Sequence, residues 1–132
     1  MTSVLLRHAS AGDRDDWDGD DESRPLDARG RRQAAELVEL LRQFGARRIL
    51  SSPAVRCVET VEPLAAALGL DVEEDRRLAE GAGRSAFELL HEEGVLCCTH
   101  GDVIEDVLGH GLKKGAAVVL EGGEVVREIR PS

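Results

Sequence analysis

The chain has 132 residues, of which 42% are hydrophobic, and this is the size and apolar content of one globular domain spanning residues 1–132. Its 17 basic and 26 acidic residues give a net charge of −9, which disfavours nucleic acid as a partner because an anionic protein repels phosphate backbones. No apolar run approaches the ~18 residues that a bilayer helix needs, so we expect no membrane contact. The first residues lack a signal-peptide pattern and the number of cysteines, three, is odd, so we expect a cytoplasmic protein without disulfides.

The first part of the chain is predicted to contain a strand, a loop and a helix. Residues 2–6 form the short apolar run of a buried strand, and the strongly acidic segment 9–24 follows as a loop. Asp27 is predicted to cap a helix that runs to Phe44, with Gly45 just past its end.

A second strand and helix are predicted next. Residues 48–51 form the strand, Ser52 is the expected N-cap, and Pro53 is the expected first residue of a helix that ends at Gly69. The side chains expected to form the buried face of this helix recur at helical spacing, at Val55, Val58, Val61, Leu64 and Leu68.

The remainder of the chain continues the alternation and ends in a hairpin. The expected elements are a weakly extended segment at 70–78, a helix at 85–93, a central parallel strand at 95–99, a helix at 102–109, and a hairpin of residues 117–120 and 124–129. This order predicts an α/β fold, a three-layer α/β/α sandwich whose mainly parallel sheet carries an antiparallel C-terminal edge hairpin.

Polar residues follow three of the predicted strands. Arg7 and His8 end the first strand, Arg56 lies in the first turn after the second, and His100 and Asp102 follow the central strand. Ligands of open parallel sheets bind beyond the carboxyl ends of the strands, so these side chains are expected to meet at one edge. Because guanidinium groups bind phosphate oxygens and a neutral imidazole can attack phosphorus, the set predicts a phosphoryl-transfer pocket.

Three motifs at these positions resemble those of the histidine phosphatase superfamily, whose fold is phosphoglycerate mutase-like. Arg7-His8-Ala9 is similar to the family's opening Arg-His-Gly/Ala motif. Residues 52–60 match its Ser-Pro-x-x-Arg-x-x-x-Thr motif in full, and His100-Gly101 matches its later His-Gly. The order and spacing of these motifs extend the resemblance over nearly the whole chain.

The resemblance implies a role for each matching residue. His8 would be the nucleophile that takes the phosphoryl group on a ring nitrogen. Arg7, Arg56 and His100 would bind the phosphoryl oxygens and stabilise the charge of the transition state. The two arginines are also expected to lower the pKa of His8, which keeps its imidazole neutral and nucleophilic.

The leaving group of such a reaction needs a proton from an acid. Many members of the family place the acid where Glu80 stands, and we favour this residue. Asp102 is the alternative, because the branch with His-Asp after the central strand uses an acid there.

The chain resembles the short SixA-like phosphohistidine phosphatase branch, and also the phosphatase domain that follows a Nudix domain in some actinobacterial proteins. We therefore expect a phosphatase with a phosphohistidine intermediate and neither cofactor nor metal. Its substrate would be a phosphoprotein or a phosphorylated small molecule such as a nucleotide. A phosphoglycerate mutase-type phosphotransferase and a catalytically silent phosphate-binding module are the alternatives, and the oligomeric state stays open.

Other site chemistries fail on spacing. No arginine stands six positions after any cysteine, as cysteine-dependent phosphatases require, and no Walker motif is present. The acids of segment 13–22 do not fit the register of a calcium-binding loop. Trp17, the only tryptophan, is expected either to pack over the mouth of the pocket or to anchor this loop.

Overall fold

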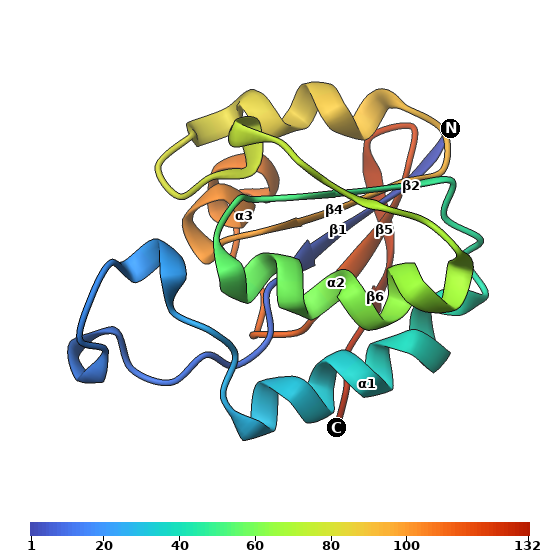
Figure 1. The fold of residues 1–132 in the computed structure, drawn as a ribbon. Coiled ribbons are helices and arrows are strands. Elements are labelled where there is room, and N and C mark those ends of the chain that lie inside the picture. The colour runs from blue at the N-terminus through green and yellow to red at the C-terminus, as the bar shows by residue number, and fades with distance from the viewer.

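Six strands form one sheet in the order β3-β2-β4-β1-β5-β6 in the computed structural model, which describes residues 1–132 (Figure 1). The strands are β1 (Thr2–Arg7), β2 (Arg48–Ser51), β3 (Val72–Glu74), β4 (Val95–Thr99), β5 (Ala117–Glu121) and β6 (Glu124–Ile129). Strands β1 to β4 run parallel, whereas β5 pairs antiparallel with β1 and β6 antiparallel with β5. The predicted mainly parallel sheet with an antiparallel C-terminal edge hairpin is confirmed.

Helices cover both faces of this sheet, which confirms the three-layer arrangement (Figure 1). The helices α1 (Ala28–Arg42) and α2 (Val55–Leu68) pack on one face, and α3 (Gly101–Leu108) packs on the other with the 3-10 segment η4 (Gly83–His91). Shorter 3-10 turns are η1 (Arg14–Asp16), η2 (Asp21–Ser23) and η3 (Arg76–Leu78). None of the helices is both long and apolar enough to span a bilayer.

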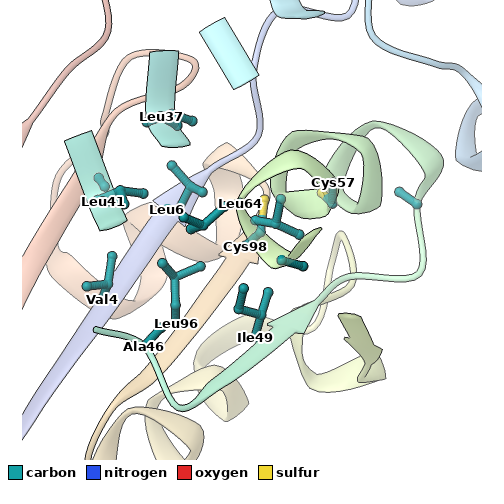
Figure 2. Close-up of a cluster of buried hydrophobic side chains, with 14 residues drawn as sticks. Val4, Leu6, Leu37, Leu41, Ala46, Ile49, Cys57, Leu64, Leu96 and Cys98 are labelled. Carbon is teal, nitrogen blue, oxygen red and sulfur yellow. The ribbon is translucent and has the colours of Figure 1, made fainter. Parts of the chain in front are cut away.

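The alternation of side chains along the strands divides the core into two layers. Leu6 and Cys98 belong to a cluster of 14 buried residues between the sheet and the helices α1 and α2 (Figure 2). Their neighbours Leu5 and Cys97 point to the opposite face, into a cluster of 13 residues beneath α3 and η4. All three cysteines are free and buried, so they serve as packed core residues.

The start of α1 is fixed by Asp27, as predicted. Its side chain accepts a hydrogen bond from the Gly30 amide at 2.7 Å, and it also binds the Ser10 hydroxyl at 2.7 Å and the Gly12 amide at 2.9 Å. Gly30 lies so close to the incoming loop that a Cβ atom there would stand 1.9 Å from the carbonyl oxygen of Ser10. The cap of α1 therefore also positions the chain that leaves the first strand.

The predicted beginning of α2 is wrong. The helix begins at Val55 rather than Pro53, and its N-cap is Ala54 rather than Ser52. The hydroxyl of Ser52 does accept from the amide of Ala54, at 3.2 Å, and it also lies 2.8 Å from Nε2 of His100, a partner distant in sequence. The helix starts later because Ala54 is extended, with a ψ of 137°. The buried face is also rotated from the expected one and consists of Arg56, Cys57, Thr60, Val61, Leu64 and Ala65.

The segment expected to form a helix at 85–93 is a 3-10 helix with different bounds. It is the 3-10 segment Gly83–His91, which begins two residues earlier than predicted. The segment 70–78 contains the short strand β3 and the turn η3, and it leads the chain to the edge of the sheet where the candidate site lies.

Candidate active site

A pocket of about 580 Å³ opens at the carboxyl ends of β1, β2 and β4. These three strands are neighbours and run parallel, so the residues after each of them reach the same edge of the sheet. None of the 14 lining residues is hydrophobic. The pocket brings together all six residues that the sequence indicated: Arg7, His8, Arg56, Glu80, His100 and Asp102.

The imidazole of His8 is held in one tautomer. Its Nδ1 lies 2.8 Å from the carbonyl oxygen of Ala9, and a carbonyl oxygen only accepts hydrogen bonds. Nδ1 therefore carries the hydrogen and donates it, which leaves the lone pair of Nε2 available. The amide of Ala9 in turn donates to Oγ1 of Thr60 at 3.0 Å, so α2 fixes the backbone that orients the ring.

Burial keeps the His8 ring neutral. Desolvation is the largest cause that lowers the pKa of His8 to about 3, opposed by the hydrogen bond to Ala9. The neighbouring His100, Arg56 and Arg7 lower the pKa of His8 further, each by less than burial does. The expected direction is confirmed, but burial rather than the two arginines is the main physical cause.

Arg7 lies along the floor of the pocket, between the first strand and α3. Its Nη1 donates to the carbonyl oxygen of Leu112 at 2.7 Å. A Cβ atom at Gly101 would stand 3.0 Å from the guanidinium carbon, so the glycine after His100 makes room for this side chain. The Nε atom of Arg7 is buried without a hydrogen-bond partner in the protein.

Arg56 is a buried cation in contact with the second pocket histidine. Its Nη2 lies 3.4 Å from Nδ1 of His100, and because a guanidinium only donates, Nδ1 is the acceptor. Nε2 of His100 then carries the hydrogen that points to Ser52. The rings of His8 and His100 lie 5.5 Å apart between centroids, close enough for both to contact one phosphate-sized anion.

Like Arg7, Arg56 has an Nε atom that is buried without a hydrogen-bond partner. Only 2% of the residue is exposed, although it carries a full charge. Buried donors of this kind are normally satisfied, and an anionic oxygen is the acceptor that a guanidinium binds most strongly. The two unpaired Nε atoms therefore indicate an anion-binding site.

The two candidate acids lie on the same wall of the pocket. Oε2 of Glu80 accepts from Nη2 of Arg14 at 2.7 Å and lies 3.8 Å from Nη2 of Arg56. Oδ2 of Asp102 accepts from the amide of Gly81 at 2.8 Å. Asp102 thus ties the segment that carries Glu80 to the beginning of α3, and Glu80 is the acid that contacts the arginines.

Three cationic pocket residues and one acid beside the pocket were not among the sequence candidates. Arg14, Arg24 and Lys114 line the pocket. Asp21 in the acidic loop pairs with Arg56 at 3.1 Å, Arg24 at 3.0 Å and Arg14 at 3.3 Å. These contacts hold the loop against the pocket, and the three arginines hold the pKa of Asp21 below its usual value against the opposing effect of burial.

One of these residues carried a usable sequence signal. Arg24 precedes Pro25-Leu26-Asp27, the segment that leads into the cap of α1, so its place beside the pocket follows from the start of that helix. Arg14 lies in an acidic loop without periodicity, and nothing local distinguishes it.

Trp17 does not line the pocket. Its Nε1 donates to the carbonyl oxygen of Asp20 at 2.9 Å, so of the two expected roles it has that of anchoring the loop. The two histidines outside the pocket, His91 and His110, are both exposed. No group of three or more histidine, cysteine, aspartate or glutamate side chains is arranged to hold a metal ion.

Comparisons with known proteins agree with the motifs and the fold. A model of the histidine phosphatase superfamily (branch 1) matches residues 3–86. The chain is 37% identical over 116 residues to an 8-oxo-(d)GTP phosphatase of Mycolicibacterium smegmatis, which covers 81% of this chain but only 36% of that protein. The chain therefore spans about a third of the length of this relative.

Two solved structures show the same fold. A SixA protein from Agrobacterium tumefaciens superposes with a TM-score of 0.77 at 22% identity, covering 99% of this chain and 98% of the other. The protein histidine phosphatase SixA in complex with tungstate gives a TM-score of 0.76 at 21% identity, over 98% and 97% of the two chains. The chain belongs to the histidine phosphatase superfamily, branch 1.

Proposed function

We propose that this chain is a metal-independent phosphatase in which Nε2 of His8 accepts a phosphoryl group and then releases it to water. The carrying observation is the convergence of a neutral imidazole and two buried guanidinium groups, those of Arg7 and Arg56, in one wholly polar pocket. Membership of the histidine phosphatase superfamily supports the same chemistry.

The first step exchanges one bond to phosphorus for another. The lone pair of Nε2 of His8 attacks phosphorus, the bond from phosphorus to the ester oxygen breaks, and that oxygen leaves with the bonding pair. The Nε atoms of Arg7 and Arg56 offer donors to the phosphoryl oxygens, whose negative charge these guanidinium groups stabilise. Arginine charge thus takes the part that a metal ion plays in other phosphatases.

Glu80 is the proposed proton donor to the leaving oxygen. It lies in the pocket beside Arg56, and its side chain is about half exposed, so it can reach a leaving group that extends towards solvent. Asp102 is the proposed positioning residue, because its carboxylate binds the amide of Gly81 directly after the donor.

The second step returns the histidine to its starting state. Water attacks phosphorus, the bond from phosphorus to Nε2 of His8 breaks, and the carboxylate of Glu80 accepts the proton of the water.

A proton on Nδ1 of His100 would turn that atom from an acceptor for Arg56 into a donor to a phosphoryl oxygen, which is the role the motif implies.

The proposed substrate is a phosphorylated small molecule, with a nucleotide as the leading class. The relative that is 37% identical is named an 8-oxo-(d)GTP phosphatase, which favours this class over a phosphoprotein. Because the match covers only 36% of that protein, the test includes both classes. Nucleotides, sugar phosphates and phosphohistidine peptides are assayed side by side.

The deciding variant is His8→Ala, assayed on 4-nitrophenyl phosphate with and without EDTA. We expect the wild type to turn over this substrate equally in both conditions, and His8→Ala to lose activity by on the order of 10³-fold or more. His110→Ala, which removes an exposed histidine outside the pocket, is the matched control and keeps full activity.

The outcomes separate the alternatives. Rapid quenching should trap the phosphoryl group on His8 as an adduct that is labile in acid and stable in base. A wild type that binds phosphate without any turnover would be a binding module. Transfer between positions of a phosphosugar that depends on a bisphosphorylated primer would identify a mutase.

A further inference from the structure

A second, strongly basic groove adjoins the reaction pocket. It has a volume of about 460 Å³, and its eight lining residues are Ser10, Arg29, Gln33, Lys113, Lys114, Ala116, Arg130 and Pro131. Four of these are cationic, in a protein whose net charge is −9, and they include the only two lysines of the chain. Lys114 lines both the groove and the reaction pocket, so the two spaces meet at this side chain.

The cations of this groove are largely unneutralised. Arg29, Lys113 and Lys114 form no salt bridge, and of the four cations of the groove only Arg130 is paired, with Glu128. Seven arginines outside the groove do form salt bridges. The nearby Asp27 is already bound by the amides of Gly12 and Gly30 and by a serine hydroxyl. The groove is therefore a local positive field in an otherwise acidic molecule.

The backbone of the groove is fixed to the backbone of the proposed nucleophile. The amide of Gly115 donates to the carbonyl oxygens of both Arg7 and His8, at 3.2 and 3.0 Å. The amide of Ala116 donates to the carbonyl oxygen of Lys113 at 2.9 Å, which closes the loop that presents the lysines. Gly115 has a φ of 81°, the left-handed conformation that favours glycine, so the tight loop is encoded locally.

We propose that this groove is a second anion subsite, which binds a further phosphate group of the substrate while the transferred group lies at His8. This rests on the proposed function and narrows its substrate class to small molecules that carry at least two phosphate groups. Lys114, at the junction, contacts the oxygens between the two positions, and Arg29 and Lys113 bind the distal group.

A small polyanion suits the groove better than a protein segment does. The only hydrophobic lining residue is Ala116, and no aromatic side chain is present. Protein interfaces depend on apolar or aromatic anchors that fill pockets, and the groove offers none. The reaction pocket likewise has no apolar wall, so charge rather than stacking selects the substrate.

Equilibrium binding tests this subsite without turnover. Methylphosphonate and methylenediphosphonate, which carry one and two phosphonate groups and are not hydrolysed, are compared by calorimetry. The wild type should bind the diphosphonate at least tenfold more tightly. The double variant Arg29→Glu/Lys113→Glu should lose most of this preference, because two attractive charges at the distal group become repulsive.

A matched double variant controls for net charge. Arg42→Glu/Arg47→Glu changes the charge equally, at the far end of α1, about 20 Å from Arg29 at 1.5 Å per helical residue. This variant should keep the preference of the wild type. Thermal melts of both variants establish that they are folded, as the exposure of all four side chains predicts.

Three results would overturn the subsite. These are equal binding of the two phosphonates by the wild type, an unchanged preference in Arg29→Glu/Lys113→Glu, and the loss of preference in both double variants alike. If Arg29→Glu/Lys113→Glu instead lost only the binding of an acidic phosphopeptide, the groove would be a protein-docking surface and the proposal would be wrong. Failure to hydrolyse 4-nitrophenyl phosphate defeats the proposed function separately, since phosphonate binding needs no catalysis.

Discussion

At the scale of single residues, the site combines groups that are costly to bury. Arg56 is almost completely buried, with one side of its guanidinium bound to Asp21 and its Nε unpaired. The carboxylate of Asp21 pairs with Arg56, Arg24 and Arg14. Guanidinium groups bind phosphate oxygens in the same way as carboxylate oxygens. The acidic loop therefore neutralises the arginines at the mouth of the pocket, while the Nε atoms deeper inside stay available.

The buried, neutral His8 makes the stability of the protein depend on pH. Its pKa is lowered from the ordinary 6.5 to about 3, so below pH 6.5 the unfolded chain binds a proton that the folded chain does not. The free energy of unfolding should therefore fall as the pH falls from 6.5 towards 4.5, by up to about 1.4 kcal/mol per pH unit. Above pH 6.5 both states are neutral at His8 and this contribution is constant.

Urea denaturation at several pH values measures this effect. His8→Asn, which has no titrating group at this position, should show a shallower decline over the same interval. His91→Asn removes an exposed histidine and should follow the wild type. Parallel curves for the wild type and His8→Asn would contradict the burial argument for His8. The pKa values of acids such as Asp21 and Asp27 are lowered in the folded chain. The stability that these carboxylates contribute is therefore lost at a lower pH than the contribution of His8.

At the scale of elements, the sequence predicted most of what hydrophobic periodicity and capping determine. The strand at 48–51, the cap at Asp27 and the hairpin around Gly122-Gly123 all lie where their patterns placed them. The beginning of α2 did not, because Ala54 is extended and is itself the N-cap, although the Ser52 hydroxyl accepts from the Ala54 amide and also lies 2.8 Å from Nε2 of His100. The local capping bond is therefore present, but it does not by itself set the first residue of the helix.

The packing of α1 against the loop at Ser10 makes Gly30 a sensitive position. Gly30→Ala would place a Cβ atom 1.9 Å from the backbone oxygen of Ser10, and neither backbone can shift without disturbing the cap. Overpacking costs about 1–3 kcal/mol, and at so close an approach to backbone we expect it to outweigh the ~1 kcal/mol that the helix propensity of alanine contributes. We expect a lower Tm and a higher KM, because the displaced loop leads to Gly12 in the pocket wall.

Thermal melts and assays on 4-nitrophenyl phosphate measure the two effects of Gly30→Ala. Arg32→Ala, an exposed substitution in the same helix, is the control and should alter neither by much. A variant Gly30→Ala that is more stable than the wild type would mean that the loop at Ser10 moves freely and that the close approach does not constrain it.

At the scale of the whole molecule, topology made the site predictable. Once β1, β2 and β4 are parallel neighbours, the residues that follow them must share an edge, and the pocket does contain Arg7, His8, Arg56 and His100. Apart from Glu80, which the family resemblance indicated, the residues contributed by irregular segments were not predicted. Arg14 lies in a loop without periodicity, and Lys114 enters from the connection between α3 and β5, where only the folded chain reveals its contact with the pocket.

The same organisation couples anion binding to global stability. A ligand that binds only the folded chain stabilises it by RT ln(1 + [L]/Kd), which is about 1.4 kcal/mol at tenfold excess over Kd. For a domain of this size we expect inorganic phosphate at that concentration to raise the Tm by about 4–6 °C. Arg56→Gln should abolish the rise, because it removes a buried donor and the charge that attracts the anion. Arg42→Gln, which removes an exposed arginine at the end of α1, should retain the rise, and an equal rise in Arg56→Gln would show that phosphate binds elsewhere.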